Sequence, residues 1–211
     1  WVSSLILPQP PSIQHEAEPN HFFSALKQPV VVAFLLGAFL LQLAHGIYYS
    51  FFSIYLEAEG YSRSTIGLLW AVGVIAEVVV FIAMHSFLQR LGVRFILIFS
   101  LIASAIRWLL IGHFVDVLVV LLFAQLLHAF TFGTFHAAAI ECVRRLFAPI
   151  HQGKGQAIYS GFSFGAGGAA GSLLGGVIWE HSPIYAYNTA TLVSLIAVFV
   201  VVLWLKDQRL H

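Results

Sequence analysis

The chain has 211 residues, of which 60% are hydrophobic and only 9% are charged. A soluble domain carries about 25% charged residues. The deficit therefore excludes a disordered chain, an ordinary cytosolic enzyme and a nucleic-acid binder built on a basic patch. The single cysteine, Cys142, excludes an intramolecular disulfide and a cysteine-cluster metal site. We expect neither a metal ion nor a cofactor.

The first 28 residues form a segment that differs from the rest of the chain. Residues 1–7 are apolar and look like the end of a preceding membrane span, and residues 8–28 have the proline-rich composition of a polar linker. No charged region opens the chain, so a signal peptide is not indicated. The chain begins at Trp1 and its only methionine is Met84, so we expect it to be a piece of a longer protein.

Six long apolar runs follow, and a membrane helix needs about 20 such residues. The runs cover residues 30–56, 65–88, 93–112, 115–143, 156–179 and 184–205. They are continuously apolar rather than alternating, which favours helices over barrel strands. The predicted fold class is an all-α membrane protein, with six transmembrane helices over residues 29–206 and a cytoplasmic tail at 207–211.

The basic residues orient this predicted bundle. Eight of the ten lysines and arginines fall on the side shared by both chain ends, namely Lys27, Arg90, Arg94, Arg144, Arg145, Lys154, Lys206 and Arg209. Only Arg63 falls on the opposite side, and Arg107 lies inside a span. The positive-inside rule then predicts that both ends of the chain are cytoplasmic. We expect a multi-pass protein of a bacterial inner membrane.

Two charged residues lie inside the apolar runs. A carboxylate at the depth of Glu77 is costly in a membrane, so it is a candidate functional group, although a packing role is the alternative. Arg107 lies toward the outer end of the third span. Its side chain could extend to the outer interface or turn inward and pair with Glu77.

Three ionisable side chains on three spans share one predicted depth. At 1.5 Å per residue, Glu77 and His128 lie about 18 Å from the outer ends of their spans, and His45 lies near the same level. One polar residue per helix can act as packing glue. Three at one depth predict the lining of a hydrated cavity.

Each of these three residues shares its helical face with an aromatic ring four or seven positions away. The rings are those of Tyr49, Trp70 and Phe132. Such a mixture suits an organic solute with a ring and a polar end. The alternative is that the rings only fill an apolar core.

Three further features of the sequence are open to more than one interpretation. His136 is either part of a cytoplasmic gate or a core histidine, and Glu141 is expected to pair with Arg144 and Arg145. The fifth run holds seven glycines between positions 161 and 176, which favours either a moving helix or tight static packing.

Two other classes of function are left open. Gly161-Phe-Ser163-Phe-Gly165 matches the G-x-S-x-G nucleophile pattern, so an intramembrane serine hydrolase with Ser163 beside His128 or His136 is one alternative. A membrane scaffold without transport activity is the other. The zinc-protease and P-loop patterns are absent from the sequence.

The loop after the second run resembles a signature of the major facilitator superfamily. Residues 85–94 read HSFLQRLGVR, similar to the G-x-x-x-D-R-x-G-R-R loop between paired helices. Arg90, Gly92 and Arg94 match, whereas Gln89 replaces the aspartate. The resemblance implies a conformational gating loop at these four positions.

Other stretches are similar to the proton-symporter branch that includes 3-phenylpropionate transporters. They are residues 44–51, 67–77, 128–133 and 153–157. The resemblance implies the C-terminal half of a twelve-helix transporter whose N-terminal six-helix half is the missing partner. It also implies that Glu77, Arg107 and His128 join solute binding to proton coupling, with Thr131 in place of a glutamate of the relatives.

From these observations we expect proton-coupled transport of a small organic solute by alternating access, and no enzymatic activity. The solute could be an aromatic acid such as phenylpropionate, a nucleoside or a sugar. Glu77 would titrate, and Arg107 would balance its charge or hold an anionic solute. His45 and His128 would bind solute or relay protons, with ring faces from the aromatic residues. Protons, membrane lipid and the missing half are the other expected partners, with no nucleic acid.

Overall fold

The computed structural model describes residues 19–206 and Leu210, and within them every regular element is helical. Six spans in this part of the chain are long and apolar enough to cross a membrane. They are Pro29–Ala58 (α3), Arg63–Leu91 (α4), Val93–His113 (α5), Leu118–Leu146, Pro149–Trp179 and Pro183–Trp204 (α10). The predicted six-helix fold is therefore confirmed. The predicted end of a preceding span at 1–7 lies outside the described residues, as does most of the tail.

Two of the spans are composite. The fourth consists of α6 (Leu118–His128), the π-helical turn η1 (Ala129–Gly133) and α7 (Thr134–Leu146). The fifth consists of η2 (Pro149–His151), α8 (Gln152–Ser160), the π-helical η3 (Gly161–Gly167) and α9 (Gly168–Trp179). The fifth span was expected to begin at residue 156. That expectation is wrong, because the span begins at Pro149. The residues before 156 are too polar to be counted as a membrane span by hydropathy, yet they are helical.

Local sequence signals explain several helix ends. Pro29 and Pro183 stand in the first turns of α3 and α10, where a missing backbone N–H costs nothing. The Ser62 side chain caps α4 by accepting a hydrogen bond from the Thr65 backbone N–H at 3.2 Å. Gly92 separates α4 from α5 with a φ of 76°, which an L side chain rarely adopts.

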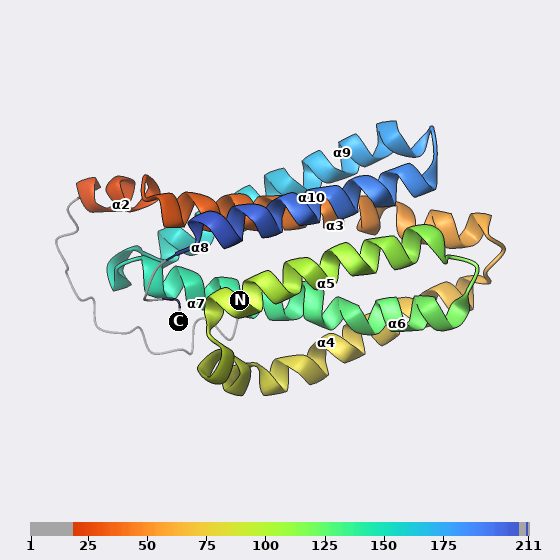
Figure 1. The fold of residues 1–211 in the computed structure, drawn as a ribbon, viewed down its shortest axis with the longest axis horizontal. Coiled ribbons are helices and arrows are strands. Elements are labelled where there is room, and N and C mark those ends of the chain that lie inside the picture. The colour runs from red at the N-terminus through yellow and green to blue at the C-terminus, as the bar shows by residue number, and fades with distance from the viewer. Residues whose placement is uncertain (1–18, 207–209, 211) are drawn as a thin grey trace, which may run out of the picture.

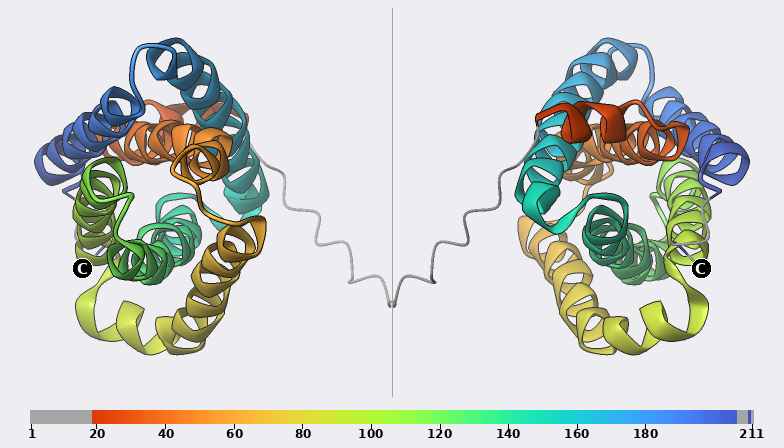
Figure 2. Two further views of the ribbon diagram at one scale, coloured as in Figure 1. Left: turned by 90° about the vertical axis from the view of Figure 1, so that its right-hand side faces the viewer. Right: turned by 90° about the vertical axis from the view of Figure 1, so that its left-hand side faces the viewer.

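The spans run nearly side by side along one long axis (Figure 1). Neighbouring spans contact one another in the order α9, α3, α10, α5, α6–α7 and α4. Viewed along the axis, α4 lies at one edge of this arrangement and α9 at the opposite edge (Figure 2). Helix α3 and the α6–α7 span therefore lie between the two edges, where the polar residues gather.

Glycines allow the close approach of α3 and α9. A Cβ atom built on Gly171 would overlap the carbonyl oxygen of Leu43, and one built on Gly46 would overlap that of Gly168. Small residues let membrane helices approach closely in this way. The glycines of the fifth run therefore pack tightly against α3 at this contact, as one of the two interpretations of that run expects.

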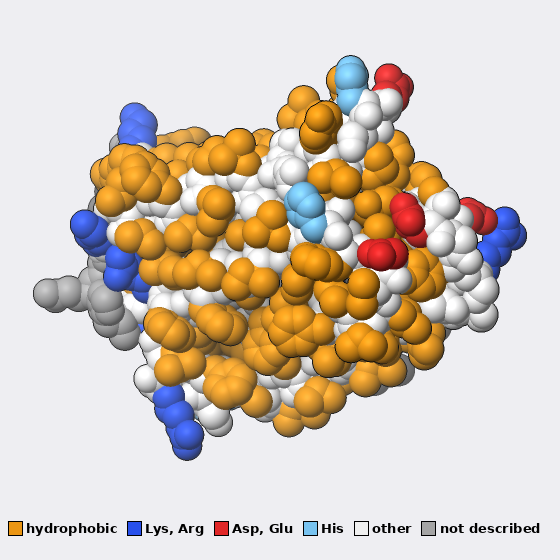
Figure 3. All heavy atoms as spheres, turned by 45° about the vertical axis from the view of Figure 1, so that its right-hand side comes forward, with side chains coloured by type: hydrophobic (Ala, Val, Ile, Leu, Met, Phe, Trp, Pro, Cys, Tyr) orange, Lys and Arg blue, Asp and Glu red, His pale blue; other side chains and the backbone are white. Residues whose placement is uncertain are grey.

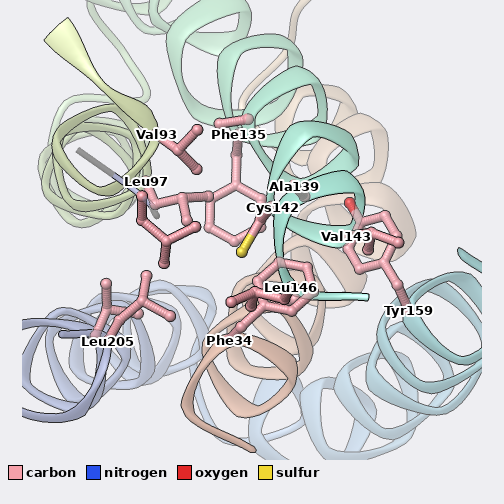
Figure 4. Close-up of a cluster of buried hydrophobic side chains, with 14 of the residues drawn as sticks. Phe34, Val93, Leu97, Phe135, Ala139, Cys142, Val143, Leu146, Tyr159 and Leu205 are labelled. Carbon is pink, nitrogen blue, oxygen red and sulfur yellow. The ribbon is translucent and has the colours of Figure 1, made fainter. Parts of the chain in front are cut away.

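The apolar interior consists of two clusters that are separated along the helices. One includes Phe34, Leu97, Phe135 and Leu146, and the other includes Ile47, Phe52, Trp108 and Leu121. Figure 4 shows the first cluster, in which side chains of α3, α5, α7 and the end of α10 meet around Cys142. On α3 the first cluster ends at Leu41 and the second begins at Ala44, beside His45. The polar site lies at this boundary.

The charged residues divide between the two ends of the bundle (Figure 3). We call one end basic: it holds α2, the α4–α5 and α7–α8 connections and the end of α10 (Figure 1), and these, with the adjoining helical turns, carry the described lysines and arginines other than Arg63 and Arg107. The other, acidic, end holds the connections α3–α4, α5–α6 and α9–α10 with the adjoining helix ends, which carry Arg63 with Glu57, Glu59, Asp116 and Glu180. This division has the asymmetry that the sequence predicts.

The predicted linker contains a short helix, α2 (Pro19–Leu26). The ring of Phe22 is 7% exposed and packs at centroid distances of 5.9 Å from Phe147 and 5.5 Å from His151. The neighbouring Phe23 is 62% exposed. One face of α2 is therefore docked on the connection between α7 and α8.

Candidate functional site

A carboxylate and an imidazole meet in the middle of the bundle. Glu77 on α4 places Oε2 3.9 Å from Nε2 of His128, the last residue of α6. Their side chains are 16% and 6% exposed. A Cβ atom on Gly133 would lie 2.9 Å from Cγ of Glu77, so the glycine makes room for the carboxylate. Two of the residues predicted to share one depth therefore face each other.

His45 of α3 completes the predicted layer. Its ring is fully buried, with its centroid 6.1 Å from that of His128 and 4.9 Å from that of Trp108. Its Nδ1 lies 2.9 Å from the carbonyl oxygen of Leu41, a hydrogen bond that fixes the ring to its own helix. The structure thus brings together His45, Glu77 and His128, as the sequence predicts.

Arg107 turns into the bundle rather than toward the outer interface. Its side chain is fully buried, and Nε donates a hydrogen bond of 2.9 Å to the carbonyl oxygen of Ala124. Its Nη2 donates a longer bond of 3.4 Å to Oε1 of Gln125. Of the two orientations left open, the inward one is therefore observed, but among the described residues the ion-pair partner of Glu77 is His128 and not Arg107. The physical reason is that the α6 carbonyl and amide lie within reach of the guanidinium.

Aromatic rings cover the guanidinium of Arg107. Its central carbon lies 4.1 Å from the ring centroid of Tyr48 and 4.7 Å from that of Trp108. The Tyr48 hydroxyl donates a hydrogen bond of 2.9 Å to Oε1 of Gln125. Ring faces attract a cation, and more strongly where water is excluded. Arg107 therefore lies behind the site and supplies buried positive charge to it.

The predicted ring faces form a wall in front of this layer. The rings of Tyr49 and Trp70 stack with centroids 5.9 Å apart, and those of His128 and Phe132 stack at 5.5 Å. Tyr49 is 46% exposed, and Trp70 donates a hydrogen bond of 3.0 Å to Ser53. The Tyr49 ring also lies 6.3 Å from His128 and 6.4 Å from Phe132 between centroids, so the wall adjoins the Glu77–His128 pair.

Sequence reasoning missed Tyr48, Trp108 and Gln125. Gln125 is buried and accepts hydrogen bonds from two helices, and it precedes His128 by three positions. A buried amide one turn from a candidate histidine was a signal that could have identified it. Tyr48 and Trp108 gave no such signal, because aromatic residues are frequent in this chain.

Four buried nitrogen atoms in this layer have no hydrogen-bond partner among the described residues. They are Nε2 of His45, Nη1 of Arg107, Nε2 of Gln125 and Nδ1 of His128. Buried polar groups are normally satisfied, so each unpaired one calls for an explanation. The guanidinium and amide nitrogens are donors, and imidazole nitrogens can be. The Arg107 and Gln125 nitrogens are therefore donors that an acceptor oxygen would satisfy. Nε2 of a neutral His45 ring is instead an acceptor, because Nδ1 donates to the carbonyl oxygen of Leu41.

The predicted gating residues lie at the basic end, away from this layer. Gly92 forms the one-residue connection, and Arg94 donates a hydrogen bond of 3.0 Å to the carbonyl oxygen of Val202 on α10. Gln89 is hydrogen-bonded to His85 at 2.9 Å, and Arg90 lies in the last turn of α4. The loop therefore joins α4 to α5, and the hydrogen bond of Arg94 links it to α10.

Ser163 does not have the surroundings of a nucleophile. It lies inside the continuous fifth span, is 1% exposed, and donates a hydrogen bond of 2.5 Å to the carbonyl oxygen of Tyr159. No described histidine is hydrogen-bonded to it. Neither His128 nor His136, the two bases that the hydrolase alternative names, is therefore in contact with the Ser163 hydroxyl in the described part of the chain. The expected pairing of Glu141 with Arg144 and Arg145 is confirmed, with N–O distances of 2.6 and 2.7 Å.

Comparison with known proteins decides the family. Residues 4–189 match the model of the MFS_1 like family. The chain belongs to this family. It is 34% identical over 170 residues to the probable 3-phenylpropionic acid transporter of Escherichia coli strain K12. It is also 26% identical over 162 residues to the uncharacterized transporter YwbF of Bacillus subtilis strain 168.

A solved structure gives the same fold. The chain superposes on a crystal structure of the nucleoside transporter NupG (D323A mutant) with a TM-score of 0.73 at 18% identity. That match covers 97% of this chain and 57% of the other. The aligned parts cover 79% and 76% of this chain but only 43% and 40% of the two curated relatives. This MFS_1 like chain is thus an integral membrane protein with a half-transporter fold, similar to relatives named as transporters.

Proposed function

We propose that this chain is the C-terminal half of a twelve-helix transporter that moves a small organic solute together with protons. The missing N-terminal six-helix half would form the opposite wall of the site, and one half would rock against the other. The basic end would be cytoplasmic in a bacterial inner membrane, because Lys and Arg are enriched on that side of membrane proteins.

The observation that carries the proposal is the contact between Glu77 and His128. Ionisable side chains at membrane depth are costly and are typical of ion pathways and proton relays. Both residues lie at a wall where Glu77 retains 16% exposure, so a proton and a solute could reach the same place. Glu77 would take up the proton, while His128 and His45 would bind solute or relay the proton.

An aromatic acid is the solute class that the wall supports best. The charge of Arg107 has no described carboxylate within ion-pair distance, so the layer favours an anion. The rings of Tyr49, Trp70 and Phe132 offer faces for an aromatic group. The Escherichia coli relative is named as a probable transporter of 3-phenylpropionic acid. A nucleoside or a sugar is the alternative, and each lacks the carboxylate.

The test is transport by the full-length protein in liposomes that contain a pH-sensitive dye. We expect a pH gradient to drive uphill uptake of phenylpropionate, but not of a nucleoside or a sugar, and the solute to carry protons with it. Glu77→Gln should abolish uphill uptake and leave solute exchange intact, because exchange needs no net proton movement. Glu180→Gln, at the acidic end, is the matched control and should leave both intact.

The outcomes separate the parts of the proposal. Wild-type uptake without proton movement would refute proton coupling. Uphill uptake by the Glu77→Gln variant at the wild-type rate would remove the role of Glu77. Uptake of a nucleoside or a sugar in place of the acid would refute the solute class and leave coupling standing.

A further inference from the structure

A second imidazole stands on the same side of the fourth span as His128, nearer the basic end. The Phe132 ring stacks on His128 with an interplanar angle of 16°, and His136 stacks on Phe132 at 13° with centroids 6.2 Å apart. In a regular α-helix each step of four residues turns about 40° past a full turn, so the three rings would spiral apart. The π-helical turn η1 is wider and offsets part of this drift.

His136 is held by the fifth span. Its Nδ1 lies 3.1 Å from the hydroxyl oxygen of Tyr159 on α8, a residue that is 1% exposed. The ring of Phe164 on η3 meets His136 edge-on at 5.6 Å, and Phe34 of α3 stacks on Tyr159 at 5.6 Å. The orientation of His136 is therefore fixed by two side chains of the fifth span, and α3 in turn supports Tyr159.

The other described titratable groups toward the basic end are already engaged or lie outside this column. Glu141 is paired with two arginines, and His85 is hydrogen-bonded to Gln89 at the exposed end of α4. His151 packs against α2 rather than in the column of rings.

The groups that face His136 are few. Tyr159 faces it from α8, and Glu77 of α4 lies against Gly133, three residues earlier on its own span. Phe34 and Phe164 bring no titratable group from α3 and η3. His136 is half-buried, and no ion pair engages it among the described residues. It is therefore able to gain and lose a proton without breaking a salt bridge.

We propose that His136 is the proton acceptor on the basic side of the transport site, and that Tyr159 positions its ring. This inference rests on the proposed function. The proton would leave the carboxyl group of Glu77, which becomes a carboxylate, and the imidazole of His136 would become an imidazolium. His136 would then release the proton to water at the basic end. The Phe132 ring, which has no side-chain donor or acceptor, stacks between His128 and His136 and would have to move for the proton to pass.

The test compares His136→Gln with Tyr159→Phe in the full-length protein in liposomes. We expect His136→Gln to slow uphill uptake by at least about tenfold, as for loss of a proton-transfer group. Solute exchange at equal pH should stay within about twofold of the wild type, because it needs no net proton release. Tyr159→Phe should keep uphill uptake but shift its pH profile. His113→Gln is the control, a histidine hydrogen-bonded to Asn188 at the acidic end.

Other results would overturn the inference. Equal slowing of uphill uptake and exchange by His136→Gln would assign His136 to solute binding or packing. An unchanged pH profile in Tyr159→Phe, together with normal uphill uptake in His136→Gln, would remove both residues from the proton path. In either case, proton uptake by the wild type would leave the proposed function standing. If the wild type moves no protons, both this inference and the proposed proton coupling are refuted.

Discussion

The close contact of α3 and α9 predicts opposite effects for two glycine substitutions in one helix. A Cβ atom on Gly171 would overlap the carbonyl oxygen of Leu43, with its carbonyl carbon at 2.7 Å and its Cα at 2.9 Å. Non-bonded carbon atoms prefer about 3.5–4.0 Å, so the two helices would have to separate by about 1 Å. A Cβ atom on Gly168, three residues earlier, meets nothing within 4 Å.

The two variants share the gain in helix propensity, which is about 1 kcal/mol for Gly→Ala. Overpacking costs about 1–3 kcal/mol, and the upper end applies to Gly171→Ala because the obstacle is backbone. The free energies of unfolding of the two variants should therefore differ by about 3 kcal/mol. At roughly 2 °C per kcal/mol, their thermal midpoints should differ by about 6 °C.

The assay is thermal unfolding of the purified full-length protein in detergent, followed by the loss of monomer on size-exclusion chromatography. Gly168→Ala should match or exceed the wild type, and Gly171→Ala should fall below it. Equal midpoints for the two variants would refute the reasoning, because the close approach of the two backbones would then carry no energetic cost.

Three further predictions follow from individual contacts. Gly133→Ala would place a Cβ atom 2.9 Å from Cγ of Glu77, so proton-coupled uptake should fall while the thermal midpoint changes little; normal uptake would contradict this. Arg107→Lys cannot reproduce the two contacts of the guanidinium with α6, so the thermal midpoint should fall by several degrees; an unchanged midpoint would show that these contacts add no stability. Phe22→Ala should speed tryptic cleavage near α2, whereas the exposed Phe23→Ala should not; equal cleavage would show that α2 is not docked.

The sequence by itself determined the six spans and the division of the charged residues between the two ends of the bundle. Hydropathy acts over windows of about 20 residues, and a bilayer requires each such segment to satisfy its own backbone hydrogen bonds as a helix. Depth could also be counted from the ends of the spans, because the rise per residue is fixed. For this reason His45, Glu77 and His128 could be assigned to one layer before any tertiary contact was known.

Only the tertiary structure decided which side chains meet within that layer. Whether Arg107 reaches Glu77 or the α6 backbone depends on helix rotation and spacing, and neither quantity is encoded in hydropathy. The same holds for Gln125, whose partners lie on α3 and α5. The π-helical turn after His128 left no recognisable local signal either, yet it keeps Phe132 and His136 in line. Composition and spacing place residues at a depth, whereas packing between helices selects their partners.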